Sequence, residues 1–197
     1  MKENRQEILA FVRKRMGWAY GNAKWLSPQE AARANKERDA LVASLGGGAN
    51  SSFCGNKLHT GELSPGCVIC GEGYWSCLFL NHLCTANCFY CPQDRKRKTE
   101  TIPSAHGILF DNPGFYAAYV KKSGHRGVGI SGGEPLLALP KLLAFIRALR
   151  KKNGKKLYIW LYTNSTLLDG AKLKALKAAG LDEIRINISA CGYGLSG

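Results

Sequence analysis

Four short apolar segments with helical patterns between them are the feature that most constrains the fold. Each has the length and composition of a buried strand, and they are residues 75–80, 128–130, 157–162 and 184–188. The patterns around and between them predict helices near residues 113–122, 139–152 and 169–179. Strands that alternate with helices in this way indicate βα units, so we expect an α/β fold with a parallel sheet.

The residues before this pattern predict a helical, cysteine-rich extension. Helices are expected over residues 3–16 and 27–45, the second opened by a capping-box serine. Residues 49–73 are punctuated by glycine and cysteine and are expected to form a loop. We therefore divide the chain into an extension, residues 1–73, and a core, residues 74–197.

Composition excludes several classes of protein. Hydrophobic residues make up 45% of the chain and charged residues 21%, which argues against disorder. No apolar run reaches the ~18 residues that a membrane span needs, and the N-terminus is amphipathic rather than a signal peptide. We therefore expect a cytoplasmic protein with no membrane partner. In that compartment the eight cysteines indicate metal binding or catalysis more than disulfides.

Three cysteines directly after the first expected strand, Cys84, Cys88 and Cys91, form the strongest motif. Thiolates are soft ligands that suit zinc or an iron–sulfur cluster. A closed zinc site needs a fourth protein ligand, whereas a four-iron cluster held by three cysteines keeps one iron open. The same spacing would also put three buried cysteines on one helix face, but the adjacent Pro92 and RKRK run make that unusual.

Polar groups also follow the other three expected strands. Gly132, Gly133 and Glu134 come after the second, Asn164 after the third and Ser189 after the fourth. Paired glycines let a ligand approach the backbone, and a carboxylate can accept from an amine. Because ligands of parallel α/β proteins bind at the carboxyl ends of the strands, we expect these groups to share one end of the sheet with the cysteines.

The sequence CTANCFYC resembles the CxxxCxxC motif of the radical S-adenosylmethionine (SAM) enzymes, and SGGEPLL, YTNSTLL and RINIS resemble their next three strand ends. The resemblance covers about residues 75–190. It implies a partial (βα) barrel of the radical SAM type. It also implies that Cys84, Cys88 and Cys91 ligate a 4Fe-4S cluster whose fourth iron is chelated by SAM.

The same resemblance implies the SAM contacts. Gly132, Gly133 and Glu134 would hold the amino group of SAM, and the Tyr90 backbone would contact the adenine. The last two contacts, to the carboxylate or ribose, would come from Asn164 and Ser189.

The chemistry that the resemblance implies belongs to the cofactor. One electron passes from the reduced cluster to SAM, the carbon–sulfur bond breaks, and the resulting 5′-deoxyadenosyl radical abstracts hydrogen from a substrate. An external one-electron donor of the flavodoxin or ferredoxin type is implied as a partner, while the substrate cannot be identified from the sequence.

The superfamily core has more βα units than the four expected here. The sequence thus resembles a barrel cut short, which predicts an exposed sheet edge and self-association or a complementing chain.

Four further cysteines leave two interpretations open. Cys54, Cys67, Cys70 and Cys77 would complete a zinc site or a second cluster, unless Cys77 is a small buried thiol of its strand. His59 is a further candidate ligand. These residues carry the alternative function, a non-catalytic, cysteine-rich metal-binding module that contacts nucleic acid.

The positive charge is concentrated in the second half of the chain. Residues 84–197 hold 18 basic and 7 acidic side chains, against 10 and 7 in residues 1–83. Residues 95–98 follow the cysteine motif and would be the run that meets an anionic substrate. Residues 150–156 end a helix and precede a strand, so we expect them at the opposite end of the sheet as a solvated surface.

Overall fold

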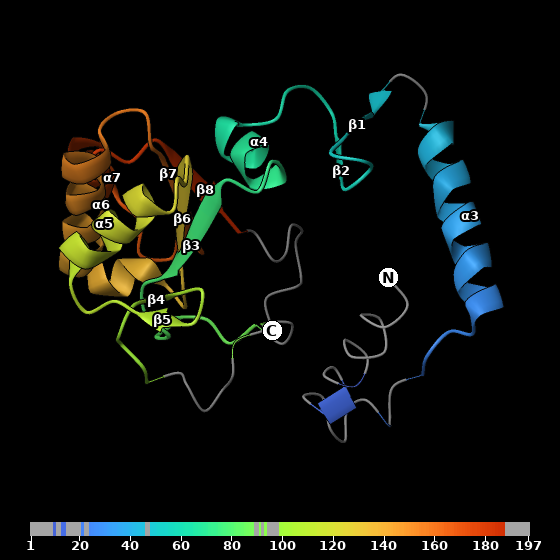
Figure 1. Ribbon diagram of the computed structural model, residues 1–197, viewed down its shortest axis with the longest axis horizontal. Coiled ribbons are helices and arrows are strands. Elements are labelled where there is room, and N and C mark those ends of the chain that lie inside the picture. The colour runs from blue at the N-terminus through green and yellow to red at the C-terminus, as the bar shows by residue number, and fades with distance from the viewer. Residues whose placement is uncertain are drawn as a thin grey trace. The chain divides into compact units, whose positions relative to one another are not determined.

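The computed structural model (Figure 1) describes residues 10, 13–14, 21, 24–45, 48–88, 91, 93 and 99–187. The helix expected over residues 3–16 lies largely outside these residues. The chain forms two compact units, Met1–Asn50 and Ser51–Gly197. The predicted domain boundary between residues 73 and 74 stays a prediction.

The described part of the first unit is dominated by one helix, α3 (Pro28–Ser44), which confirms the second expected helix. Its start follows the predicted capping box. The Glu30 backbone N–H donates to Ser27 Oγ at 3.2 Å, and the Ser27 N–H donates to Glu30 Oε2 at 2.7 Å. No residue of α3 is buried.

The second unit contains a six-stranded sheet in the order β5-β4-β3-β6-β7-β8. Its strands are β3 (Trp75–Phe79), β4 (Ser104–Ala105), β5 (Ile108–Leu109), β6 (Gly127–Ser131), β7 (Tyr158–Thr163) and β8 (Glu183–Ile186). Strands β3, β6, β7 and β8 are parallel, as predicted, and β4 and β5 add an antiparallel hairpin at the edge of β3. The sheet stays open in the described part of the chain, so it matches a partial βα barrel.

Helices cover both faces of this sheet (Figure 1). Those on one face are α5 (Pro113–Lys122), the 3-10 helix η3 (Pro135–Ala138), α6 (Leu139–Asn153) and α7 (Gly170–Ala179). They enclose the main core, whose largest fully buried side chains include Tyr116, Phe145 and Ile146. Within the described residues, no helix is long and apolar enough to cross a membrane.

The opposite face carries α4 (Pro65–Gly71), in the segment for which we predicted a loop. Residues 49–73 also contain the short strands β1 (Asn50–Ser52) and β2 (Lys57–His59), so the loop prediction was wrong. The helix has ordinary start signals, because Ser64 Oγ accepts from the Cys67 N–H and Pro65 follows it. Its two glycines made the helix hard to predict from the sequence. Close neighbours require them, because a Cβ at Gly66 would lie 2.6 Å from Arg185 Nη2 and one at Gly71 would lie 2.3 Å from the Phe53 ring.

One edge of the sheet, at β8, borders a hollow of about 340 Å³ beside α7. Apolar side chains line it with three charged ones: Leu173, Leu176, Lys177, Leu181, Asp182, Glu183 and Ile184. The predicted association of the chain through this edge stays a prediction.

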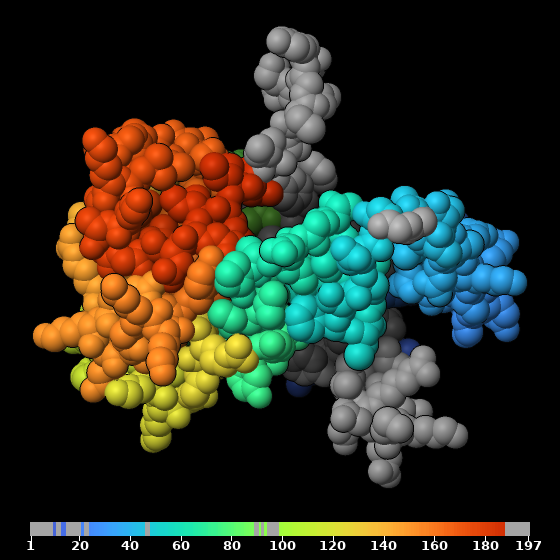
Figure 2. Space-filling view, turned by 90° about the horizontal axis from the view of Figure 1, so that it is seen from above, coloured from blue at the N-terminus to red at the C-terminus, as the bar shows by residue number. Residues whose placement is uncertain are grey.

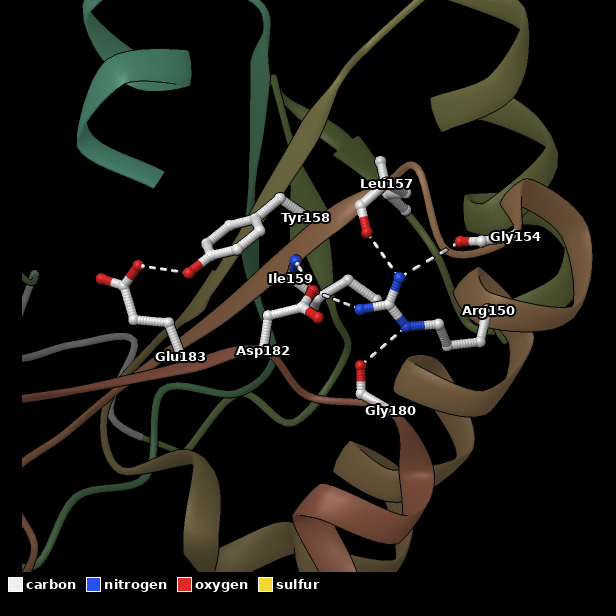
Figure 3. A network of polar contacts seen from close by, with 8 residues as sticks. All are labelled: Arg150, Gly154, Leu157, Tyr158, Ile159, Gly180, Asp182 and Glu183. Atoms are coloured by element: carbon white, nitrogen blue, oxygen red, sulfur yellow. Dashed lines mark hydrogen bonds and ion pairs between the residues drawn. The ribbon is translucent and has the colours of Figure 1, made fainter. Parts of the chain in front are cut away.

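Arg150, the first residue of the basic run, joins four segments at the amino-terminal end of the sheet (Figure 3). Its guanidinium donates to the carbonyls of Gly180 (2.7 Å), Gly154 (3.1 Å) and Leu157 (2.5 Å), and it pairs with Asp182 Oδ2. The ends of α6 and α7 are thereby tied to the starts of β7 and β8. Figure 2 looks onto this end, where the connection from α6 to β7 is orange. The run therefore lies opposite the carboxyl ends of the strands, as predicted.

Replacing Arg150 with alanine is expected to lower the free energy of unfolding by about 3 kcal/mol, because it leaves the part-buried Asp182 without its cation. Arg150→Lys should recover only part of this loss, since an ammonium lacks the planar fork. The neighbouring Lys151 is exposed, so Lys151→Ala is the matched control. Urea denaturation measures all three. Equal stability of Arg150→Ala and Lys151→Ala would contradict the structural role.

Candidate functional site

A pocket of about 190 Å³ lies where the parallel strands end. Its lining joins the loop that contains Cys84, Cys88 and Cys91, called the cysteine loop below, to residues at the ends of β6, β7 and β8. The lining residues are Cys84, Ala86, Cys88, Cys91, Gln93, Ser131, Gly132, Gly133, Tyr162, Thr163, Asn164 and Asn187. Six of the expected site residues are thus brought together. Glu134 is not part of the lining, and Tyr90 and Ser189 lie outside the described residues.

The backbone of the cysteine loop is paired to the Gly-Gly-Glu segment beyond the ends of β3 and β6. The Leu80 N–H donates to the Ser131 carbonyl at 2.8 Å, and the Gly133 N–H donates to the Asn81 carbonyl at 2.9 Å. The Glu134 N–H donates to the Leu83 carbonyl at 2.6 Å, one residue before Cys84. This ladder therefore sets the position from which the cysteine loop begins.

The two glycines are required by this pairing. A Cβ at Gly133 would lie 1.9 Å from the Leu83 carbonyl oxygen, and one at Gly132 would lie 2.3 Å from that of Asn81. Gly132 also has a φ of 142°, a backbone conformation that other residues rarely adopt. We predicted a close approach of a ligand here, and the structure shows a close approach of the chain to itself. Both glycines nevertheless line the pocket.

The Glu134 side chain is fully buried and is not exposed to the pocket. Its Oε1 accepts from the Leu136 N–H (3.0 Å) and from Thr163 Oγ1 (2.8 Å), and its Oε2 accepts from the Asn164 N–H (2.8 Å). The carboxylate therefore links the end of β6 to the end of β7. The predicted contact with the SAM amino group stays a prediction.

The cysteine loop fits a cluster better than a single ion. Among the described residues, no three His, Cys, Asp or Glu side chains are placed to hold one metal ion. In a cubane cluster, however, each thiolate binds a different iron, so three sulfurs need not share one coordination sphere. Cys84, Cys88 and Cys91 are free thiols that line one pocket, and soft thiolates are the donors that such clusters use. The donor set thus fits a 4Fe-4S cluster.

Among the described residues, no three of the other cysteines are placed to hold one metal ion. Cys67 and Cys70 lie on α4, Cys77 lies on β3 and Cys54 is exposed in the turn after β1. Burial, with a smaller contribution from Cys70, raises the pKa of Cys77 to about 11, so its thiol is protonated at neutral pH. The structure thus shows a partly buried, protonated thiol at Cys77, and the second metal site stays a prediction.

His59 has partners other than a metal. Its Nε2 lies 3.1 Å from Ser52 Oγ, and its Nδ1 lies 2.8 Å from the Gly61 carbonyl. Both ring nitrogens are therefore used within the β1–β2 segment.

Two threonines, two amides and a tyrosine of the site were not singled out from the sequence. Tyr162, Gln93 and Asn187 line the pocket, and Thr85 and Thr166 bond to Asn164. Thr85 lies within CTANCFYC and Thr166 within YTNSTLL, so the motifs contained them. Their hydroxyl groups gave no signal of their own because threonine is common in loops.

Comparison with known proteins agrees with this site. The family model described as "Radical SAM superfamily" matches residues 79–191, which is more than half of the chain. Over 126 residues, 64% of this chain, the sequence is 36% identical to a protein of Methanocaldococcus jannaschii named "Putative glycyl-radical enzyme activating enzyme". It is 34% identical to the "PqqA peptide cyclase" of Gluconobacter oxydans over 55% of this chain, and 36% identical to the "Probable GTP 3',8-cyclase" of Methanococcus aeolicus over 53%.

The matched segment covers 33%, 28% and 33% of these three relatives, respectively, so the chain spans at most about a third of their length. No solved structure gives a significant match. The family match includes the cysteine loop, the Gly-Gly-Glu segment and the ends of β7 and β8, which are the segments that build the pocket. The chain therefore belongs to the radical SAM superfamily, whose members use a 4Fe-4S cluster and SAM.

Proposed function

We propose that this chain forms the cluster-binding and part of the SAM-binding region of a radical SAM enzyme that cleaves SAM reductively. The observation that carries the proposal is the single pocket that joins Cys84, Cys88 and Cys91 to Gly132 and Gly133 at the carboxyl ends of the parallel strands.

In this proposal the cluster and SAM, when bound, supply one-electron cleavage of a carbon–sulfur bond and a 5′-deoxyadenosyl radical for hydrogen abstraction. The chain itself binds and orients. The three cysteines would hold the irons, Gly132 and Gly133 would bind the amino group of SAM, and the Glu134 side chain ties their segment to the end of β7. The predicted roles of Tyr90 and Ser189 toward SAM belong to the same proposal.

The relatives support the shared chemistry rather than any one substrate. Their names refer to a glycyl-radical enzyme, a peptide and GTP, although their identities to this chain differ by only two percentage points. A segment so evenly shared among enzymes with different named substrates carries what they have in common. We therefore propose an external one-electron donor as a partner and assign no substrate.

The test is anaerobic reconstitution of the whole chain with iron and sulfide. We expect a brown protein with about four irons per chain and a reduced-cluster EPR signal that changes when SAM is added. A colourless protein that holds only zinc would overturn the proposal. So would a four-iron cluster whose EPR signal is unaffected by saturating SAM.

A further inference from the structure

Asn164, which lines the pocket, forms a closed ring of hydrogen bonds with two threonines. Asn164 Nδ2 donates to Thr85 Oγ1 at 3.0 Å, and Thr166 Oγ1 donates to Asn164 Oδ1 at 2.8 Å. The two hydroxyl oxygens lie 2.8 Å apart. Since the Thr166 proton is given to Asn164, Thr85 donates to Thr166 and completes the ring. The ring thus joins the cysteine loop to the loop after β7, 79 residues further along the chain.

The orientation of the Asn164 amide follows from its backbone neighbour. The Thr166 N–H lies 3.0 Å from Asn164 Oδ1, and a backbone N–H can only donate. The atom that faces it is therefore the oxygen, and the amide nitrogen faces the cysteine loop. The second proton of that nitrogen is directed at Cys84 Sγ, 3.9 Å away, a long contact that the large sulfur atom permits.

Backbone hydrogen bonds to two side chains fix the loop that contains Asn164. Its backbone N–H donates to the buried Glu134 carboxylate, and the Ser165 N–H donates to Thr163 Oγ1 at 3.0 Å. Ser165 has a φ of 63°, a conformation that is uncommon for residues other than glycine and that persists where surrounding contacts impose it. The amide is therefore presented to Cys84 by a constrained turn.

We propose that Asn164 is a positioning residue of the cysteine loop, held by the Thr85–Asn164–Thr166 ring, and that its amide N–H raises the reduction potential of the cluster. This inference rests on the proposed function, because it needs Cys84 to be a cluster ligand. A donor near a ligating sulfur stabilises the more negative, reduced cluster, and hydrogen bonds to sulfur are among the factors that set cluster potentials. This role differs from the carboxylate or ribose contact that the resemblance implies for Asn164.

The test is the midpoint potential of the reconstituted cluster without SAM, in variants that alter the ring. Asn164→Asp preserves the shape of the side chain but replaces the N–H donors with an anionic oxygen. We expect the ratio of reduced to oxidised cluster at a fixed potential to fall about tenfold, which is ~59 mV for a one-electron couple. Thr85→Val removes one member of the ring and should shift the potential in the same direction by a smaller amount.

Two further variants separate tuning from a general loss of structure. Thr85→Ser retains the hydroxyl and should restore the wild-type potential, whereas a role in packing alone would not be rescued by the smaller side chain. Thr60→Val alters an exposed threonine outside the ring and should change nothing. Wild-type potentials in Asn164→Asp and Thr85→Val, with four irons bound, would overturn the inference and leave the proposed function intact. A wild-type chain that binds no cluster would overturn both.

Discussion

Replacing Cys88 with alanine is expected to abolish cluster binding rather than to reduce it by a third. The three thiolates of the pocket would share one cubane, and losing one leaves a second iron without a protein ligand. The same result is expected for Cys84→Ala and Cys91→Ala. Iron content after anaerobic reconstitution and the charge-transfer absorbance of the cluster measure the effect.

The chain supplies its own control for this experiment. Cys54 is an exposed free thiol in the turn after β1, and burial raises the pKa of Cys77, so that its thiol stays protonated. Cys54→Ala and Cys77→Ala should therefore retain about four irons, although Cys77→Ala loses some packing. A Cys88→Ala variant with a full cluster would remove Cys88 from the ligand set. Loss of the cluster in Cys54→Ala would instead favour a role for Cys54 as a metal ligand.

The parallel sheet could be predicted because strands and helices leave different periodicities in a sequence. Buried strands such as β7 are continuous apolar runs, and α6 has an amphipathic pattern that ends at a glycine. The carboxyl ends of parallel strands meet at one edge whatever the details of packing. The shared location of the cysteines, Gly132, Gly133 and Asn164 therefore followed from the order of the elements alone.

Features that depend on contacts between distant segments could not be predicted in this way. Helix α4 contains two glycines in seven residues, a poor helical sequence, and it is stabilised by packing on the sheet. The hairpin of β4 and β5 has strands of two residues, too short to show alternation. The inward orientation of Glu134 depends on Leu136, Thr163 and Asn164, and no spacing rule connects these residues.

The close approach at Gly132 and Gly133 was predicted correctly, but the approaching group was not. Both glycines of the Gly-Gly-Glu segment were predicted to permit close approach, and a close approach is found. A sequence does not say which group approaches, because only the fold brings residues 80–83 over Gly132 and Gly133. The same holds at β6, where Gly127 and Gly129 make room for the Trp160 side chain, since a Cβ would lie 2.7 and 2.8 Å from it.

Replacing Gly133 with alanine is the second change with a large expected effect. The added methyl group would lie 1.9 Å from the Leu83 carbonyl oxygen, which is backbone and cannot swing aside as a side chain can. This clash can be relieved only if the two paired backbone segments move apart. Their separation would break the 2.6 Å hydrogen bond from the Glu134 N–H to the Leu83 carbonyl. Overpacking of this kind costs about 3 kcal/mol, so thermal denaturation should show Tm lowered by roughly 6–12 °C.

The clash should also reach the cluster, because Leu83 directly precedes Cys84 and a displaced carbonyl moves the first ligand. We expect Gly133→Ala to bind much less than the wild-type four irons even at temperatures where the chain stays folded.

Two control variants identify the cause of this loss. Gly129→Ala crowds the Trp160 side chain rather than the backbone before Cys84, so it should lower Tm yet retain the cluster. Gly170→Ala has no neighbour within 4 Å and should leave both unchanged or raise Tm slightly. If Gly133→Ala loaded iron as fully as Gly170→Ala, the pairing of the Gly-Gly-Glu segment with the cysteine loop would not be what positions Cys84.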